Sequence, residues 1–369
     1  MNKEKNKVSV VIAGAGIVGL SCAFFLSDEI DDIVVVEREL SFGRGISSRN
    51  SEVVHAGIYY PNNSKRAKFC IEGRRLLYEF CEDLDIKYSK CGKIIVGFSQ
   101  EDENYIFKLY ENAKTNEVEG IELLSEKGLK NKEPQLNGKI GIYSAETGII
   151  DTHCLMRALE RMSSEKGVIF SYGCELQKIY FDGNEFCCLI KDNDGKIVEL
   201  YSDIFINCTG LNSFEVSKML DEKMEKFFNF RFFKGEYFSV SNKFRNIFKR
   251  LIYPVPDKYG LGIHTVFSFD GVLKLGPNSF EIKEVDYRVD ESHVNEFFLA
   301  GKKIIKNLKL TDLFPDMSGI RPKLFVNDEY VEDFYIEKKL NAFIDLVGID
   351  SPGLTAALSI GRYVKKLCI

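Results

Sequence analysis

The feature that most constrains the fold is an apolar stretch followed by three closely spaced glycines. Residues 8–13 form the apolar stretch, and Gly14, Gly16 and Gly19 follow with the spacing G-x-G-x-x-G. The first glycine allows a tight turn, the second lets a ligand phosphate approach the backbone, and the third lets a helix pack on the preceding strand. A helical run and a second apolar strand at 33–36 come next. This order predicts a β-α-β unit of an α/β fold with a parallel sheet.

The second strand ends on an acidic residue. Glu37 lies eighteen residues after Gly19, where a carboxylate accepts hydrogen bonds from an adenosine ribose and repels the 2′-phosphate of NADP. The adjacent Arg38 weakens the argument against NADP, because a guanidinium accommodates a phosphate. The helix start adds free N–H groups and a positive dipole end for a pyrophosphate. The sequence thus predicts a Rossmann-like dinucleotide site formed by Gly14, Gly16, Ile17, Val18, Gly19, Glu37 and Arg38.

Two later segments favour FAD over NAD as the dinucleotide, and a third offers a second approach to it. The loop 43–51 is rich in glycine, hydroxyl and amide groups, which suit a long cofactor. An apolar strand at 204–207 leads into a Thr-Gly turn that gives a second approach to the dinucleotide. The turn 351–355 opens a helix, and a helix N-terminus stabilises negative charge on a reduced flavin. We expect cofactor contacts from Ser47, Ser48, Arg49, Asn50, Thr209, Gly210, Ser351, Pro352, Gly353, Leu354 and Thr355.

Composition restricts the classes of binding partner and the cellular compartment that we expect. The 369 residues carry a formal net charge of −5, which gives no electrostatic case for nucleic acid. No apolar run approaches the roughly 18–20 residues of a membrane span, and no secretion signal is recognised. None of the ten cysteines forms a CxxC pair or clusters with histidine, which predicts buried thiols and no metal site. We expect a cytoplasmic protein, with peripheral contact at the inner membrane left open.

The pattern of segments predicts a nucleotide-binding domain assembled from separated pieces. We assign residues 1–90, 140–215 and 318–369 to a discontinuous FAD-binding domain, and residues 91–139 and 216–317 to a substrate-binding domain. The stretch 215–315 is aromatic and strand-like, which predicts an antiparallel sheet in the second domain. Helices are expected at 101–114, 124–131 and 291–308, and separate strands at 196–201 and 204–207.

One loop resembles a known enzyme family. Residues 47–61 read Ser-Ser-Arg-Asn-Ser-Glu-Val-Val-His-Ala-Gly-Ile-Tyr-Tyr-Pro, which is similar to the flavin-contact loop of the L-2-hydroxyglutarate dehydrogenase (oxidase) family. That family belongs to the D-amino-acid-oxidase-like flavoproteins. Further matching segments are Glu72–Leu77, Lys90–Val96, Lys234–Tyr237, Leu251–Pro254, Gly262–His264, Gly276–Asn278, Gly319–Lys323 and Gly348–Thr355.

The resemblance implies a D-amino-acid-oxidase-like fold, noncovalent FAD and oxidation of L-2-hydroxyglutarate to 2-oxoglutarate. It also places Gly319 among the cofactor contacts. Two positions depart from the family pattern: Lys234 stands where arginine is usual, and Asp350 where glutamate is frequent.

The chemistry of a 2-hydroxy acid calls for a base. Hydride leaves C2 for flavin N5, while the hydroxyl group loses a proton to the protein. Histidine suits the proton transfer because it titrates near neutral pH. His55 lies in the flavin-contact loop and His264 on a strand of the substrate-binding domain, and which of the two is the base stays open.

A carboxylate substrate also needs cationic partners. Arg321 precedes Pro322, so its backbone is restricted to an extended conformation. Its guanidinium can hold a carboxylate through two parallel, charge-assisted hydrogen bonds. The further candidates for substrate binding are Tyr60, Lys234, Tyr237, Tyr253 and Lys323.

Other functions are also compatible with the sequence. The nearest alternative is a glycerol-3-phosphate oxidase-like enzyme, or an amino-acid or amine oxidase on the same scaffold. An NAD-dependent dehydrogenase and a non-catalytic flavin-binding module are more distant. The sequence leaves the electron acceptor open among a quinone, oxygen and another flavoprotein.

Overall fold

The computed structural model describes residues 5–256 and 262–369. Its largest sheet is built around β1 (Lys7–Ala13), which lies between two parallel neighbours, β2 (Ile33–Glu37) and β12 (Ile197–Asn207). The central residues of β1 are fully buried, as expected for a parallel sheet covered on both faces. The opening β-α-β unit is therefore confirmed.

The full strand order of this sheet is β10-β11-β12-β1-β2-β9, with β21 on β12 and β20 on β21. The remaining strands are β9 (Ile169–Tyr172), β10 (Glu175–Phe181), β11 (Phe186–Lys191), β20 (Tyr335–Lys339) and β21 (Phe343–Val347). Strands from the start, the middle and the end of the chain thus lie side by side in one sheet. The carboxyl ends of β1, β12 and β21 consequently meet at one edge.

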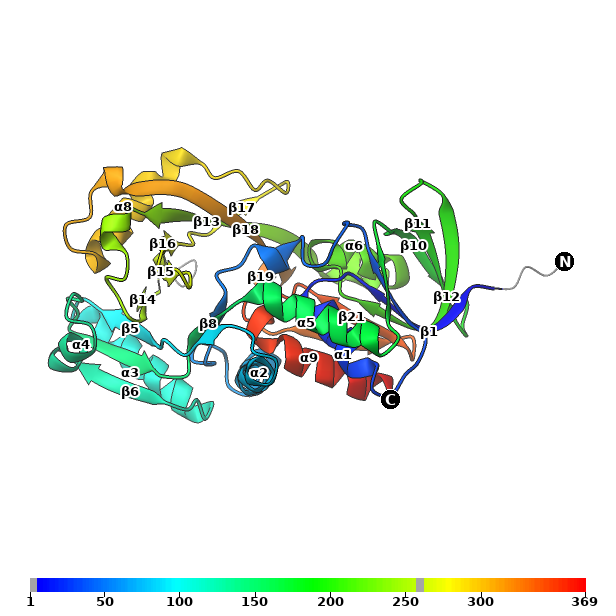
Figure 1. Ribbon diagram of the computed structural model, residues 1–369, viewed down its shortest axis with the longest axis horizontal. Coiled ribbons are helices and arrows are strands. Elements are labelled where there is room, and N and C mark those ends of the chain that lie inside the picture. Colours follow the sequence, from blue (N-terminus) through cyan, green and yellow to red (C-terminus); the bar gives the residue numbers. More distant parts are fainter. Residues whose placement is uncertain (1–4, 257–261) are drawn as a thin grey trace.

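Helices cover this sheet. Helix α1 (Ile17–Leu26) packs against α9 (Gly353–Cys368), so the first and the last helix of the chain lie side by side (Figure 1). Helix α2 (Lys65–Asp83) also packs on α9, and α5 (Thr152–Glu165) packs on α1. The largest apolar cluster fills the space between these helices and the sheet. Helices α6 (Ser213–Leu220) and α7 (Lys223–Phe227) follow β12 along the chain.

A second sheet is dominated by two long antiparallel strands, β13 (Asn229–Val240) and β18 (Leu313–Val326). Short strands extend it: β15 (His264–Phe267), β16 (Leu273–Gly276), β17 (Phe280–Ile282) and β19 (Glu329–Tyr330). Its register pairs Phe233 with Arg321 and Gly235 with Gly319. Because side chains alternate along a strand, Arg321 and Lys323 share one face. Helix α8 (Val294–Ile304) packs on this sheet.

A four-stranded sheet adjoins the second one, in the order β14-β5-β7-β6. Its strands are β5 (Lys93–Gly97), β6 (Ile121–Ser125), β7 (Ile140–Ser144) and β14 (Leu251–Pro254), with helices α3 (Glu101–Thr115) and α4 (Glu126–Lys132) packed on it. A small sheet of β3 (Val53–Val54), β8 (Gly148–Ile150) and β4 (Tyr88–Ser89) joins this region to the nucleotide-binding half.

The structure changes some predicted elements. The strands expected at 196–201 and 204–207 are one strand, β12, whose first half pairs with β11 and whose second half pairs with β1 and β21. The helix expected at 291–308 is shorter, with α8 ending at Ile304. The division into domains stays a prediction, but β18 runs unbroken through residue 318, and β7 pairs with β5 rather than with the large sheet.

The expectations about membrane-spanning segments and about cysteines can be compared with the structure. Within the described residues, every helix is too short or too polar to cross a lipid bilayer. All ten cysteines are free thiols, and Cys22, Cys70, Cys81 and Cys188 are fully enclosed.

Candidate active site

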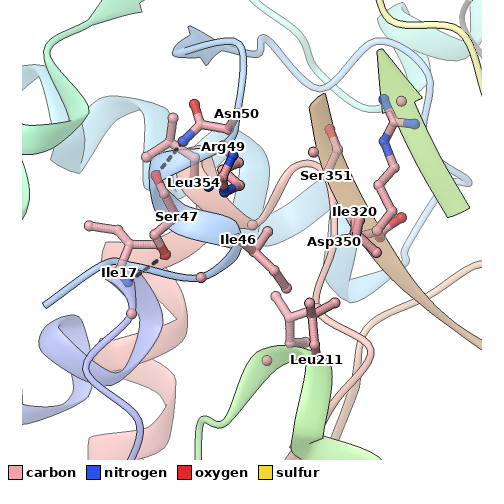
Figure 2. A pocket seen from close by; sticks show the side chains of 18 of the residues that line it. Ile17, Ile46, Ser47, Arg49, Asn50, Leu211, Ile320, Asp350, Ser351 and Leu354 are labelled. Atoms are coloured by element: carbon pink, nitrogen blue, oxygen red, sulfur yellow. Dashed lines mark hydrogen bonds between the residues drawn. The ribbon is translucent and has the colours of Figure 1, made fainter. Parts of the chain in front are cut away.

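A cavity of about 1230 Å³ lies between the nucleotide-binding sheet and the sheet of β13 and β18. Its lining comes from the glycine loop, the loop 43–51, strand β18 and the turn before α9 (Figure 2). Most predicted site residues line it: Gly14, Gly16, Ile17, Val18, Glu37, Arg38, Ser47, Arg49, Asn50, His55, Tyr60, Thr209, Gly210, Tyr237, Tyr253, His264, Gly319, Arg321, Lys323, Ser351, Pro352, Gly353, Leu354 and Thr355. Gly19, Ser48 and Lys234 do not.

The glycine loop is packed so tightly that side chains would not fit. A Cβ atom on Gly14 would lie 2.5 Å from the Cys208 carbonyl oxygen, and Gly14 has a φ of +101°. A Cβ atom on Gly19 would lie 2.0 Å from the Gly14 carbonyl oxygen. Gly19 therefore shapes the loop from behind rather than lining the cavity. On Gly16 the nearest atom would be Ser47 Oγ at 3.2 Å, so this glycine faces the ligand space.

The ends of α1 and β2 are held by polar contacts. The Ile17 N–H in the first turn of α1 donates to Ser47 Oγ at 3.0 Å (Figure 2). Glu37 accepts from the Ala15 N–H at 2.8 Å and from the Glu39 N–H at 2.9 Å. Each carboxylate oxygen has a second lone pair, so Glu37 can still accept from a ribose hydroxyl. The carboxylate thus fixes the loop and stays available to a ligand.

The loop 43–51 is held by its own side chains. Asn50 Nδ2 donates to the Ser47 carbonyl oxygen at 2.6 Å, and Asn50 Oδ1 accepts from the Glu52 N–H at 2.6 Å. The Arg49 guanidinium stacks 3.9 Å from the centre of the Tyr287 ring. A Cβ atom on Gly319 would lie 2.3 Å from the Arg49 carbonyl oxygen. Gly319 is therefore required for β18 to approach this loop.

The turn before α9 closes the cavity. Helix α9 begins at Gly353, and its first residues, Gly353, Leu354 and Thr355, line the cavity, where a helix N-terminus favours negative charge. Thr355 Oγ1 accepts from the His55 N–H at 3.0 Å, which ties the closing turn to the flavin-contact loop. Two segments three hundred residues apart are thereby fixed against each other.

His55 is enclosed at the junction of these two segments. Its Nε2 atom lies 3.4 Å from Ser351 Oγ, its carbonyl oxygen accepts from the Cys70 thiol, and its Nδ1 atom has no partner among the described residues. Burial lowers the pKa of His55 well below 6.5, and the nearby Lys93 and His264 lower it further. The imidazole is therefore neutral at neutral pH.

His264 lies on the opposite sheet. Its Nδ1–H donates to the Gly262 carbonyl oxygen at 2.8 Å, so its Nε2 atom carries a lone pair. The ring stacks on Tyr253, with 3.7 Å between ring centres. Burial lowers the pKa of His264 to about 3, with smaller contributions in the same direction from Lys93 and Arg321. His264 is thus a second neutral imidazole in the cavity wall.

Arg321 supplies a cation without a built-in counter-ion. No described carboxylate forms an ion pair with its guanidinium, which faces the cavity from β18. A Cβ atom on Gly235 would lie 3.1 Å from Arg321 Nη1, so the glycine leaves room for the guanidinium. Burial raises the pKa of Tyr237 and Tyr253, and the charge of Arg321 opposes this rise. Both hydroxyls are therefore protonated donors.

Lys323 lies two residues further along the same face of β18. Its Nζ atom is 4.7 Å from the ring centres of Phe233 and Tyr330. Burial lowers the pKa of Lys323, while Asp350 opposes that shift. Together Lys323 and Arg321 make this wall of the cavity positive.

Lys234 is placed elsewhere. Its ammonium lies 3.3 Å from the carboxylate of the fully buried Glu236 and donates to the Arg288 carbonyl oxygen. Glu236 also accepts from His293 Nδ1 at 2.6 Å. Lys234 thus points away from the face of β13 that carries the cavity. Its ammonium compensates the buried charge of Glu236 instead of facing a ligand.

Sequence reasoning missed a buried ion pair beside the closing turn. Arg66 on α2 pairs with Asp350, and both side chains are less than one-tenth exposed. The Arg66 guanidinium also lies over the rings of Tyr330 and Phe334. A signal existed, because a cation in the first turn of a helix is unfavourable unless an anion compensates it. Tyr330 was also missed as a lining residue, and Tyr59 was considered as a hydroxyl donor without being selected, since tyrosines are too numerous to single out.

The comparisons with known proteins decide the family. The family described as FAD dependent oxidoreductase (DAO) matches residues 9–367. The chain belongs to this family. Its cofactor is FAD, and the lining residues fit that cofactor: glycines where a Cβ atom would block the cradle, a ribose-binding acid and helix N-termini at two points of the cavity.

Curated relatives cover nearly the whole chain. The mitochondrial L-2-hydroxyglutarate dehydrogenase of Arabidopsis thaliana is 32% identical over 98% of this chain and 83% of its own length. The mitochondrial enzyme of the same name from Homo sapiens is 29% identical over 96% of this chain and 87% of its own. L-2-hydroxyglutarate dehydrogenase of Escherichia coli K12 is 29% identical over 96% and 91%.

Solved structures share the fold. L-alpha-glycerophosphate oxidase from Mycoplasma pneumoniae, with FAD bound, superposes with a TM-score of 0.86 at 22% identity, covering 98% of this chain and 94% of that one. Glycine oxidase from Geobacillus kaustophilus gives 0.81 at 17% identity, covering 99% and 95%. These likenesses confirm the D-amino-acid-oxidase-like fold.

Proposed function

We propose that this protein oxidises L-2-hydroxyglutarate, or a close 2-hydroxy acid, to the 2-oxo acid with noncovalently bound FAD. The observation that carries the proposal is the cationic face of β18, where Arg321 has no carboxylate partner among the described residues. Relatives named L-2-hydroxyglutarate dehydrogenase in plants, animals and bacteria support the substrate. A dicarboxylate matches two neighbouring cations on one strand face.

In this proposal Arg321 binds the C1 carboxylate through two parallel hydrogen bonds. Lys323, on the same strand face, binds the distal carboxylate. Tyr237 and Tyr253 donate hydroxyl hydrogens toward the oxygens near C1, and Tyr60 lies beside the closing turn. The arrangement selects substrates with an acid group at each end.

His55 is proposed as the base that takes the hydroxyl proton. Its imidazole is neutral and has a nitrogen atom without a partner among the described residues. His264 is held by Gly262 and Tyr253, which suits it to orient the substrate oxygen through Nε2. Bound FAD would supply the acceptor for the hydride that leaves C2, at flavin N5.

Anaerobic titration of the purified holoenzyme tests the substrate. L-2-hydroxyglutarate should bleach the flavin absorption, whereas D-2-hydroxyglutarate, glycerol 3-phosphate and glycine should not. Bleaching by glycerol 3-phosphate with inhibition by phosphate would instead identify a glycerol-3-phosphate oxidase-like enzyme. Release of ammonia from an amino acid would identify an amino-acid oxidase. Either result would overturn the proposal.

The electron acceptor is tested in the same cuvette. Substrate-reduced enzyme is mixed with air or with a water-soluble quinone, and the return of flavin absorption is timed. We propose a cytoplasmic protein, in peripheral contact with the inner membrane, that passes its electrons to a quinone, to oxygen or to another flavoprotein. The faster of the two reoxidation rates distinguishes quinone from oxygen, and slow reoxidation by both would favour another flavoprotein.

A further inference from the structure

Lys93 is a buried cation that the proposed mechanism does not use. It begins strand β5, between Ser144 on β7 and Leu251 on β14, and it is only 1% exposed. No described carboxylate forms an ion pair with its ammonium. A buried charge without a counter-ion is strongly unfavourable, so its retention calls for an explanation.

Two tyrosine rings enclose the Lys93 ammonium. Its Nζ atom lies 4.7 Å from the ring centre of Tyr59 and 4.7 Å from that of Tyr253. Both rings line the cavity, and both hydroxyls are buried without a partner among the described residues. Cation–π attraction to two rings offsets part of the desolvation of the ammonium. Lys93 thus stands directly behind the aromatic wall of the cavity.

The same wall carries the two imidazoles. Tyr253 stacks on His264, and the charge of Lys93 lowers the pKa of both His55 and His264. The lysine therefore acts electrostatically on both candidates for the base without touching the ligand space, since it is not among the lining residues.

Few other ionisable groups face this region. Cys70 on α2 lies near Lys93, but burial raises the pKa of its thiol to about 12, so the thiol is neutral. Tyr59 and Tyr253 are neutral because burial raises the pKa of each hydroxyl. Arg321 on β18 acts on His264 in the same direction as Lys93. Burial lowers the pKa of Lys93 itself to about 7.

We propose that Lys93 is a positioning residue for the proton transfer: its ammonium, held between Tyr59 and Tyr253, adds like-charge repulsion to the burial that keeps the imidazoles of His55 and His264 neutral and ready to accept a hydroxyl proton. The role in catalysis rests on the proposed function. Like charges repel, so an imidazolium beside Lys93 is disfavoured. Removing the lysine charge should raise the pKa of both imidazoles.

The Lys93→Met variant of the holoenzyme tests the proposal, because it keeps the length of the side chain and removes its charge. With ¹⁵N-labelled histidine, the four imidazoles can be assigned by single His→Gln variants and titrated by NMR. We expect the His55 and His264 titrations to move to higher pH by at least about half a unit. The acidic limb of kcat/KM against pH should move the same way.

Lys90→Met is the matched control. Lys90 lies three residues earlier, is 43% exposed in its side chain and pairs with Glu146, so its loss should leave both titrations unchanged. The His153 and His293 resonances serve as internal references. Equal titrations of His55 and His264 in wild type and Lys93→Met would overturn the proposal.

A second measurement covers the case in which Lys93→Met does not fold. In the wild-type holoenzyme, the resonances of His55 and His264 should respond to the loss of the Lys93 proton, with an inflection near pH 7 separate from their own titration. Absence of that inflection from both residues would overturn the proposal. The NMR measurements need no substrate, whereas the proposed function is tested by flavin reduction with substrate. Failure of the Lys93 proposal and failure of the proposed function can therefore be told apart.

Discussion

At the scale of single residues, the site depends on where a side chain is absent as much as on where one is present. Gly16 lines the cavity, and only Ser47 Oγ would lie near a Cβ atom there. Arg321 occupies space that Gly235 leaves open. Small residues thus make room for the ligand, while the polar groups beside them determine which ligand can enter.

Gly16→Val should abolish retention of FAD while leaving the fold intact. The valine would project into the ligand space rather than into packed backbone. The measurement is the flavin-to-protein absorbance ratio after gel filtration, with circular dichroism to verify folding. Gly128→Ala in helix α4 is the control, since a Cβ atom there meets only side chains at 3.3 Å or more. Normal flavin content in Gly16→Val would contradict the assignment of the glycine loop.

Arg321→Lys should raise the KM for L-2-hydroxyglutarate by about 10- to 100-fold. The charge is kept, but one of two charge-assisted hydrogen bonds, worth about 1.5–3 kcal/mol, is lost. Steady-state kinetics measure the change, and Arg362→Lys, at a surface pair with Glu72, is the control. An unchanged KM would remove Arg321 from the substrate site.

His55→Ala should slow anaerobic flavin reduction by about 10²- to 10⁴-fold, the range for loss of a general base. Substrate affinity should change less, because the carboxylates bind to Arg321 and Lys323. Stopped-flow absorption separates the two quantities. His264→Ala is the comparison: if it slows reduction as much as His55→Ala and leaves affinity intact, the roles of the two histidines are reversed.

At the scale of elements, the closing turn is held by contacts with distant segments. The Asp350 carboxylate pairs with Arg66 on α2, and Thr355 at the start of α9 accepts a hydrogen bond from His55. The turn is thereby anchored to two other elements, in addition to its own hydrogen bond from the Gly353 N–H to the Asp350 carbonyl oxygen. Loss of either anchor should loosen the turn, and loss of one member of the ion pair should leave the other as a buried, uncompensated charge.

Asp350→Asn should lower the free energy of unfolding by about 3–5 kcal/mol, because Arg66 would remain buried without its anion. The double variant Arg66→Met with Asp350→Asn should regain much of that loss, since no charge is then buried. Urea unfolding, monitored by circular dichroism at a fixed FAD concentration, measures both. Equal stabilities of Asp350→Asn and wild type would show that the pair contributes little to the fold.

At the scale of the whole molecule, two sheets built by different parts of the chain meet around one cavity. The nucleotide-binding sheet supplies the glycine loop and the closing turn, while the sheet of β13 and β18 supplies Arg321 and Lys323. Burial lowers the pKa of His55 and His264 in the cavity wall, and that of Lys93 on the four-stranded sheet behind it. The folded state thus favours the uncharged forms of Lys93, His55 and His264.

This preference makes stability depend on pH. Between pH 7 and 9 the unfolded chain keeps Lys93 protonated, with a pKa near 10.5, whereas the folded protein releases the proton near pH 7. The unfolded state binds more protons, so the free energy of unfolding should rise with pH, by up to about 1.4 kcal/mol per unit. Urea unfolding at several pH values should show this slope in wild type and a smaller one in Lys93→Met. Equal slopes would contradict it.

The sequence by itself determined the β-α-β unit and the glycine cradle, and most of the site residues that it predicted do line the cavity, because these depend on local spacing and on residues adjacent along the chain. His55 and Arg321 were predicted from short motifs, the first of them mostly through the resemblance to a known family. The sequence also placed Lys234 among the substrate contacts, although that side chain instead lies against the buried Glu236.

Only the tertiary structure decided which side chains share the cavity and which face away. The pairing of Arg66 with Asp350, and the position of Lys93 behind Tyr59 and Tyr253, join segments that are far apart in sequence. The physical reason is that ionisation and ion pairing depend on burial and on distance in space. Both quantities exist only after the chain has brought its separated segments together.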